Sequence, residues 1–109
     1  MAFLAGFIGI GKYEDPTVRD LIGARRDATA LWALFKDTIP DITDRHLVDA
    51  DATVVAIRRL FDETLGAAGP DDIVVLSFAG HGTRAYELVA HDSVRTDPLE
   101  SMISMDEMA

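Results

Sequence analysis

The sequence has 109 residues, the length of one small domain, and its composition excludes several classes of protein. Hydrophobic residues make up 49% and charged residues 27%, so a packed core is expected rather than a disordered or low-complexity chain. Nineteen Asp and Glu against ten Lys and Arg give a net charge of −9, which repels nucleic-acid phosphates and anionic lipids. We therefore expect neither nucleic acid nor a membrane as a partner.

The chain contains no Cys, which removes disulfides, thiolate metal sites and a cysteine nucleophile from these residues. Its first residues, MAFLAGFIGIGK, are apolar but lack the basic stretch that opens a secretory signal. The apolar run is also far shorter than the roughly 20 residues that a membrane-spanning helix needs. We interpret it as a buried strand and expect a cytoplasmic protein.

Three apolar segments and two helical patterns alternate along the chain. Residues 3–10 are apolar on both alternations, which predicts a strand covered on both faces. Residues 12–21 carry many charges and Pro16, so they form a surface loop. From Asp27 to a stop at Pro40 the pattern is helical, with an apolar face. That face consists of Ala28, Leu31, Trp32, Phe35 and Ile39.

The second half of this pattern begins with residues 45–49, which predict a short, edge-like strand. Asp51 or Thr53 can cap the following helix, which ends near Gly66 or Gly69. Its apolar positions are Val54, Ile57, Phe61, Leu65 and Ala68. Residues 73–79, IVVLSFA, form a continuous β-branched and apolar run, the clearest strand of the sequence.

The order strand, helix, strand, helix, strand predicts an α/β fold. Each connection holds a helix long enough to return the chain, so the strands are parallel and the crossovers right-handed. We expect an open three-layer sandwich with a mainly parallel sheet of order 2-1-3. Further on, residues 86–90 are consistent with a short strand, and residues 99–109 with the beginning of a helix.

In open parallel sheets, ligands bind outside the carboxyl ends of the strands, where the strand order reverses. Here that position lies between the first and third strands, so the loop opened by Lys12, Tyr13 and Glu14 should face residues 80–82. Of the three His in the chain, only His81 stands at the end of a central strand. A His between two Gly can equally be an ordinary surface turn residue.

Four blocks of sequence favour a functional role for His81 over that of a surface turn residue. They are GIGKYED, IGARRDATAL, LVDADAT and SFAGHGT, each on the expected element and in this order. Together they resemble the caspase and metacaspase family of cysteine peptidases, especially its bacterial members. The resemblance covers nearly the whole chain and corresponds to the amino-terminal part of the large catalytic unit. Residues 1–109 are then the first part of one incomplete caspase-like domain.

This resemblance implies a cysteine endopeptidase that needs no cofactor or metal. The family's catalytic dyad is a His after the third strand and a Cys after the fourth, and His81 matches the His. The amide beside the His binds the oxyanion, which makes Gly82 the candidate here. Asp27 matches a position where metacaspase-like members place an acidic residue near the pocket for a basic P1 side chain. The alternative for Asp27 is simple stabilisation of a helix N-terminus.

The sequence departs from the family at the nucleophile. A caspase-type Cys lies roughly 50 residues beyond its His, whereas only residues 82–109 follow His81. We therefore expect the Cys, and the strand that carries it, to come from outside this chain, which alone would be inactive. Without that strand, residues 73–79 would present an open apolar edge. The chain alone should be aggregation-prone or incompletely folded until a second polypeptide or a downstream segment completes it.

Two other function classes stay open. One is a degenerate, non-catalytic caspase-like module that binds partners or scaffolds an assembly. The other is a generic doubly wound domain whose GHG loop binds an anion or a nucleotide. Gly6, Gly9 and Gly11 do not favour the latter, because their spacing is GxxGxG rather than the dinucleotide-binding GxGxxG. Close packing of the strand explains them better.

The remaining chemistry-bearing residues have plain structural interpretations. His91 and Asp92 could bind a metal with His81, but scattered ligands without fixed spacing are usually ordinary loop residues. The acidic residues near the carboxyl end could attract Ca²⁺, although a solvated acidic surface is the default. We expect His46 at a solvent-exposed strand start and Trp32 in the core.

Overall fold

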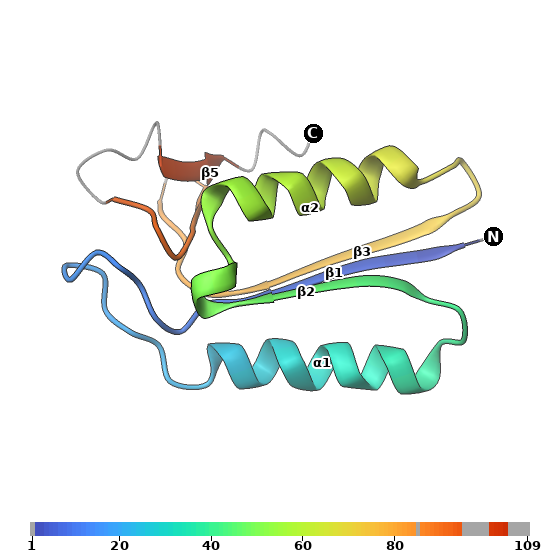
Figure 1. The fold of residues 1–109 in the computed structure, drawn as a ribbon, viewed down its shortest axis with the longest axis horizontal. Helices are drawn as coiled ribbons and strands as arrows, with labels where there is room; N and C mark the ends of the chain where they lie inside the picture. The colour runs from blue at the N-terminus through green and yellow to red at the C-terminus, as the bar shows by residue number, and fades with distance from the viewer. Residues whose placement is uncertain (1, 85, 95–100, 105–109) are drawn as a thin grey trace.

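A three-stranded parallel sheet lies between two helices, α1 and α2 (Figure 1). The computed structural model describes residues 2–84, 86–94 and 101–104. The strand order is β2-β1-β3, as the sequence predicts. The elements of this layered unit are β1 (Phe3–Gly9), α1 (Ala24–Thr38), β2 (Thr43–Val48), the short 3₁₀-helix η1 (Asp49–Asp51), α2 (Val54–Ala67) and β3 (Ile73–Ala79).

Most element boundaries agree with the sequence patterns, and the differences have local causes. Strand β3 agrees residue for residue, and Thr53 caps α2 by accepting a hydrogen bond from the amide of Ala56 at 3.2 Å. Strand β2 begins at Thr43, two residues before the prediction, because Thr43 already pairs with β1. Helix α1 begins at Ala24, ahead of Asp27. Its N-cap, Gly23, has a φ of 99°, a left-handed conformation that glycine adopts without strain.

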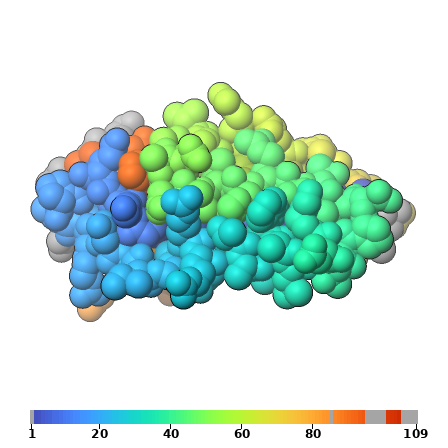
Figure 2. Space-filling model, turned by 60° about the horizontal axis from the view of Figure 1, so that its bottom comes forward, coloured from blue at the N-terminus to red at the C-terminus, as the bar shows by residue number. Residues whose placement is uncertain are grey.

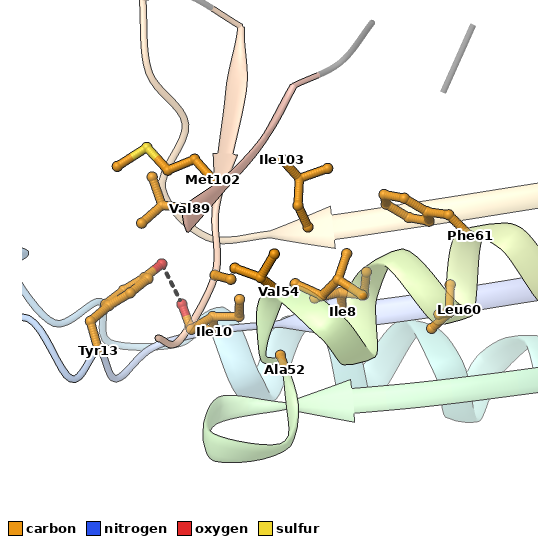
Figure 3. Packing of buried hydrophobic residues seen from close by; sticks show 12 residues of the cluster. Ile8, Ile10, Tyr13, Ala52, Val54, Leu60, Phe61, Val89, Met102 and Ile103 are labelled. Carbon is orange, nitrogen blue, oxygen red and sulfur yellow. Dashed lines mark hydrogen bonds between the residues drawn. The ribbon is translucent and has the colours of Figure 1, made fainter. Parts of the chain in front are cut away.

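Strand β1 is buried on both sides, and its alternation divides the core in two. Phe7 packs edge-on against Phe35 of α1, with ring centroids 5.3 Å apart. Ile8 and the following Ile10 belong to the opposite cluster, under α2 (Figure 3). Both Phe7 and Ile10 have no exposed surface. A strand between two helical layers needs apolar side chains at every position, which explains the continuous apolar run of the amino-terminal segment.

Beyond β3 the chain forms a small antiparallel hairpin of β4 (Glu87–Val89) and β5 (Met102–Ser104). The first of these strands confirms the prediction for residues 86–90. The second corrects the prediction of a helix over residues 99–109: residues 102–104 are a strand, and residues 99, 100 and 105–109 lie outside the described residues. Residues 102–104 form a strand because pairing with β4 satisfies the hydrogen-bonding groups of their backbone and buries Ile103 completely against the core.

Trp32 of α1 and His46 of β2 form a stacked aromatic pair on the α1 side of the sheet, which the sequence does not predict. The indole of Trp32 stacks on the imidazole of His46, with centroids 4.7 Å apart and ring planes within 4°. Trp32 also donates its indole N–H to Asp44 at 2.5 Å, and His46 lies 3.1 Å from the hydroxyl of Thr29. Trp32 is half-buried beside β2 rather than in the buried core, because its indole N–H reaches the Asp44 carboxylate. His46 is half-buried rather than solvent-exposed, because β2 turns its side chain toward α1.

The sheet has two outer strands, and β3 is one of them. Among the described residues, β1 is the only strand that pairs with β3, so the other edge of β3 carries no strand. This agrees with the open edge predicted from the sequence, whereas the aggregation expected from it stays a prediction. Neither described helix is long and apolar enough to span a bilayer.

Candidate functional site

Two loops meet at the carboxyl edge of the sheet, where β1 and β3 end side by side. The amide of Ile10 donates to the carbonyl of Ala79 at 2.9 Å, which extends the pairing by one residue. Just beyond it, the backbone amide of His81 donates to the hydroxyl of Tyr13 at 2.9 Å. The loop after β1 therefore faces the loop after β3, as the predicted strand order requires.

The side chain of His81 is half-buried between these loops. Its Nε2 lies 2.7 Å from the carbonyl oxygen of Arg19. A carbonyl only accepts hydrogen bonds, so Nε2 carries the proton and Nδ1 of the neutral ring keeps a free electron pair. The Arg19 carbonyl thus selects the tautomer in which Nδ1 is the basic nitrogen.

The loop that presents the Arg19 carbonyl is closed at its base. The amide of Leu21 donates to the carbonyl of Gly11 at 2.8 Å, and the amide of Gly11 donates to the Asp49 carboxylate at 2.8 Å. A Cβ at position 11 would lie 2.5 Å from the Leu21 carbonyl oxygen, so only glycine permits this closure. Residues 11–21 consequently form a cross-linked loop, seen at one end of α1 in Figure 2 (blue).

His81 opens onto a surface cavity of about 310 Å³. One wall comes from the loop before α1, the second from the loop after β3 and the third from the hairpin. Its lining residues are Thr17, Val18, Arg19, His81, Gly82, Thr83, Val89 and Met102. A cavity built from three separate segments, with one imidazole at its wall, is a suitable place for a reacting group.

Gly82 stands directly beside His81 and pairs with Leu88 of β4 in an antiparallel bridge. The flanking hydrogen bonds run from the Thr83 amide to the Glu87 carbonyl and from the Val89 amide to the His81 carbonyl. In such a pair the central residues point their own N–H groups away from the partner strand. The Gly82 amide is therefore directed out of the hairpin, and Gly82 itself is exposed.

Asp27 is not brought to this cavity. It is exposed in the first turn of α1, where its backbone amide donates to Gly23 at 2.8 Å. It lines neither the His81 cavity nor the neighbouring cavity of about 330 Å³ that includes Asp20 and Asp49. A carboxylate at this place favours the positive end of the helix, so the structural interpretation accounts for its position.

His91 and Asp92 form structural contacts of the same loops. The Nδ1–H of His91 donates to the Lys12 carbonyl at 2.7 Å, and the Asp92 carboxylate accepts from the first amide of α2, that of Val54, at 2.9 Å. Within residues 2–84, 86–94 and 101–104 there is no group of three His or acidic side chains placed to hold a metal ion.

The sequence indicated the positions of His81 and Gly82 after β3, but not the two groups that form hydrogen bonds with His81. The Arg19 carbonyl belongs to the backbone, which carries no residue-type signal. The Tyr13 hydroxyl was within reach of the argument, because Tyr13 opens the loop predicted to face His81. Its burial, at 9% exposed, was the observation that only the structure could supply.

Comparison with protein families matches residues 2–109 to the caspase domain. The chain belongs to the caspase-domain family. A caspase-like peptidase with peptide or protein substrates follows from this membership, and the β2-β1-β3 sheet with a His after β3 agrees with it. Comparison with curated proteins gives no significant match.

Proposed function

We propose that this chain is the His-bearing part of a caspase-like cysteine endopeptidase, with His81 as the acid–base residue and the Cys supplied from outside residues 1–109. The observation that carries the proposal is the hydrogen bond from His81 Nε2 to the Arg19 carbonyl. It leaves Nδ1 free to take a proton in a cavity at the carboxyl edge of the sheet.

The reaction is an acyl transfer. Nδ1 of His81 takes the proton from the Cys thiol, and the thiolate attacks the carbonyl carbon of the scissile peptide bond. The carbon–nitrogen bond breaks, and the imidazolium returns the proton to the leaving amine. Water then hydrolyses the thioester to regenerate the thiol. Throughout, the Arg19 carbonyl accepts from Nε2 and thereby stabilises the positive charge of the ring.

Gly82 serves as an oxyanion donor in this proposal. Its amide is directed out of the hairpin, and a Cβ on Gly82 would approach nothing closer than the Glu87 carbonyl at 3.6 Å. The fold itself therefore does not require glycine at position 82. Close approach of a substrate carbonyl to the backbone supplies a reason for it.

The open edge of β3 is the place where we propose the Cys-bearing strand pairs. In the part of the chain that the structure describes, the outer edge of the seven-residue β3 is unpaired, and such an edge offers main-chain donors and acceptors to another strand. A strand added there in parallel would end at the same edge of the sheet as His81. Asp27 stays a proposed specificity residue for a basic P1 side chain, although it does not line the His81 cavity.

The decisive experiment measures peptide hydrolysis by the 109-residue chain alone and by its assembly with the Cys-bearing polypeptide. Peptides with Arg, Lys or Asp at P1 are the substrates. The assembly should hydrolyse one of these, and replacement of His81 by Ala should lower kcat at least about 100-fold. The chain alone, which has no Cys, should show no activity.

His46→Gln is the matched control, because it also removes an imidazole but lies on β2 beside α1. It should keep the activity of the parent. Wild-type activity of the His81→Ala assembly would overturn the acid–base role. An assembly that forms but hydrolyses no peptide would instead identify a non-catalytic caspase-like module.

A further inference from the structure

The buried phenol of Tyr13 joins the two chain segments that follow β1 and β3 at the site. Its hydroxyl donates to the carbonyl of Ile10 at 3.1 Å, as Figure 3 shows, and accepts the backbone N–H of His81 at 2.9 Å. The tyrosine ring also lies against the imidazole, with centroids 5.2 Å apart and planes tilted by 48°. A single side chain thus contacts both the backbone and the ring of His81.

Gly80 makes room for this contact. A Cβ at position 80 would lie 3.1 Å from the Tyr13 hydroxyl and 2.9 Å from Cζ of Phe78. Both distances are tighter than ordinary van der Waals contact, so any larger residue would displace the phenol or the Phe78 ring. The glycine before His81 is therefore coupled to the tyrosine after β1, although 67 positions of sequence separate them.

Tyr13 also belongs to the loop that holds the other end of His81. The base of this loop is closed by the Gly11–Leu21 hydrogen bond, and its Arg19 carbonyl accepts from Nε2. Residues of one loop consequently accept hydrogen bonds from two atoms of His81, the backbone nitrogen and Nε2. Burial raises the pKa of Tyr13, so the phenol stays protonated and keeps its donor role at neutral pH.

We propose that Tyr13 is a positioning residue for His81: its hydroxyl fixes the His81 backbone so that Nε2–H reaches the Arg19 carbonyl and Nδ1 remains the basic nitrogen. This inference rests on the proposed function for its catalytic meaning. The geometric part, that loss of one hydroxyl changes the tautomer of a ring in another loop, stands independently and can be measured without any hydrolysis.

The test compares Tyr13→Phe with the matched control Tyr86→Phe. Both remove one phenolic oxygen, but Tyr86 is 78% exposed. Nitrogen-15 NMR of the histidine rings, recorded on the full chain and again on its assembly with the Cys-bearing polypeptide, reports the tautomer of His81. Tyr13→Phe should lower the fraction of the Nε2–H tautomer and raise hydrogen exchange of the His81 amide about tenfold, because one hydrogen bond is lost. Tyr86→Phe should change neither.

Gly80→Ala provides a second arm, since it displaces the phenol while Tyr13 is retained. It should give the same NMR signature. In the active assembly, Tyr13→Phe should lower kcat about tenfold with KM nearly unchanged. A Tyr13→Phe protein that is less stable but keeps the parent tautomer and amide exchange would overturn the inference, since that is the result of a purely structural role.

The two proposals fail separately. If His81→Ala leaves hydrolysis unchanged, the acid–base role is wrong, while the NMR comparison still decides whether Tyr13 positions the ring. If the tautomer is insensitive to Tyr13 but His81→Ala abolishes hydrolysis, the proposed function stands and the positioning role is wrong.

Discussion

The two faces of the sheet are packed in different ways. Helix α2 buries large side chains against one face, whereas α1 buries only Ala24 and Ala28 against the other. On the α2 face the buried set includes Val54, Ile57, Leu60, Phe61 and Thr64. On the α1 face, small residues bring the helix close to the backbone of β1, and half-buried aromatic rings fill the remainder.

The difference matters for function because only the α2 face continues into the site. Val89 and Met102 of the hairpin pack in the same cluster as Ile8 and Leu60 (Figure 3), and both also line the His81 cavity. The core under α2 therefore supports one wall of the site directly. The α1 face supports it only through the loop that leads from β1 to the helix.

The largest effect expected from this comparison is the loss of a core leucine on the α2 face. Leu60→Ala should lower the free energy of unfolding by about 2–5 kcal/mol, because Leu60 has no exposed surface and its removal leaves a cavity. Leu34→Ala on α1 deletes the same atoms from a side chain that is 59% exposed, and should cost about 0.5 kcal/mol or less. Urea denaturation of the two variants measures both values.

Equal losses for the two leucines would contradict this prediction. The hairpin sharpens the same test. If the α2 core supports the site, Leu60→Ala should also increase hydrogen exchange at the Val89 amide, which donates to the His81 carbonyl. Leu34→Ala should leave that amide protected.

A second prediction concerns two glycines of β1, and here the larger loss of stability is expected on the α1 face. Gly9→Ala should destabilise by about 1–3 kcal/mol, because its Cβ would lie 2.7 Å from the Ala24 carbonyl oxygen and 2.5 Å from the Ala28 Cβ. Neither group can rotate away. Gly6→Ala on the α2 face meets Cδ2 of Leu60 at 2.5 Å, the end of a rotatable side chain, and should cost less. Thermal unfolding of both variants measures the two losses of stability, and a larger loss of stability for Gly6→Ala would contradict the prediction.

These residues also show how far the sequence reaches. The alternation of strand and helix patterns predicted the parallel sheet, and burial on both faces of β1 leaves a direct trace in Phe7, Ile8 and their neighbours. The alternation also placed His81 at the end of β3. It did not predict the strand of residues 102–104, which exists only because residues 87–89 lie beside it. Nor could it find the Arg19 carbonyl, since any residue supplies one. A local sequence pattern predicts neither pairing between distant segments nor the position of a backbone carbonyl.

The smallest expected effect is a pH dependence on the α1 face. Burial, and secondly the positive charge of Arg25, hold the pKa of His46 below its usual value of 6.5, although the Asp44 carboxylate opposes the shift. The unfolded chain therefore binds this proton more readily than the folded protein does. Stability due to neutral His46 is present above pH 6.5 and is lost as the pH falls through the lower folded pKa.

His46→Gln removes this titration while keeping an oxygen that can accept from Thr29. Between about pH 7.5 and about pH 5, the free energy of unfolding should fall more for the parent than for the variant. The difference between the two proteins isolates His46, because His81 and His91 are common to both. The same fall in both would mean that stacking on Trp32 protects the charged and neutral imidazole equally. Since the Trp32–His46 pair lies on the α1 side, His46→Gln should leave the tautomer of His81 unchanged at every pH, which separates this face from the site once more.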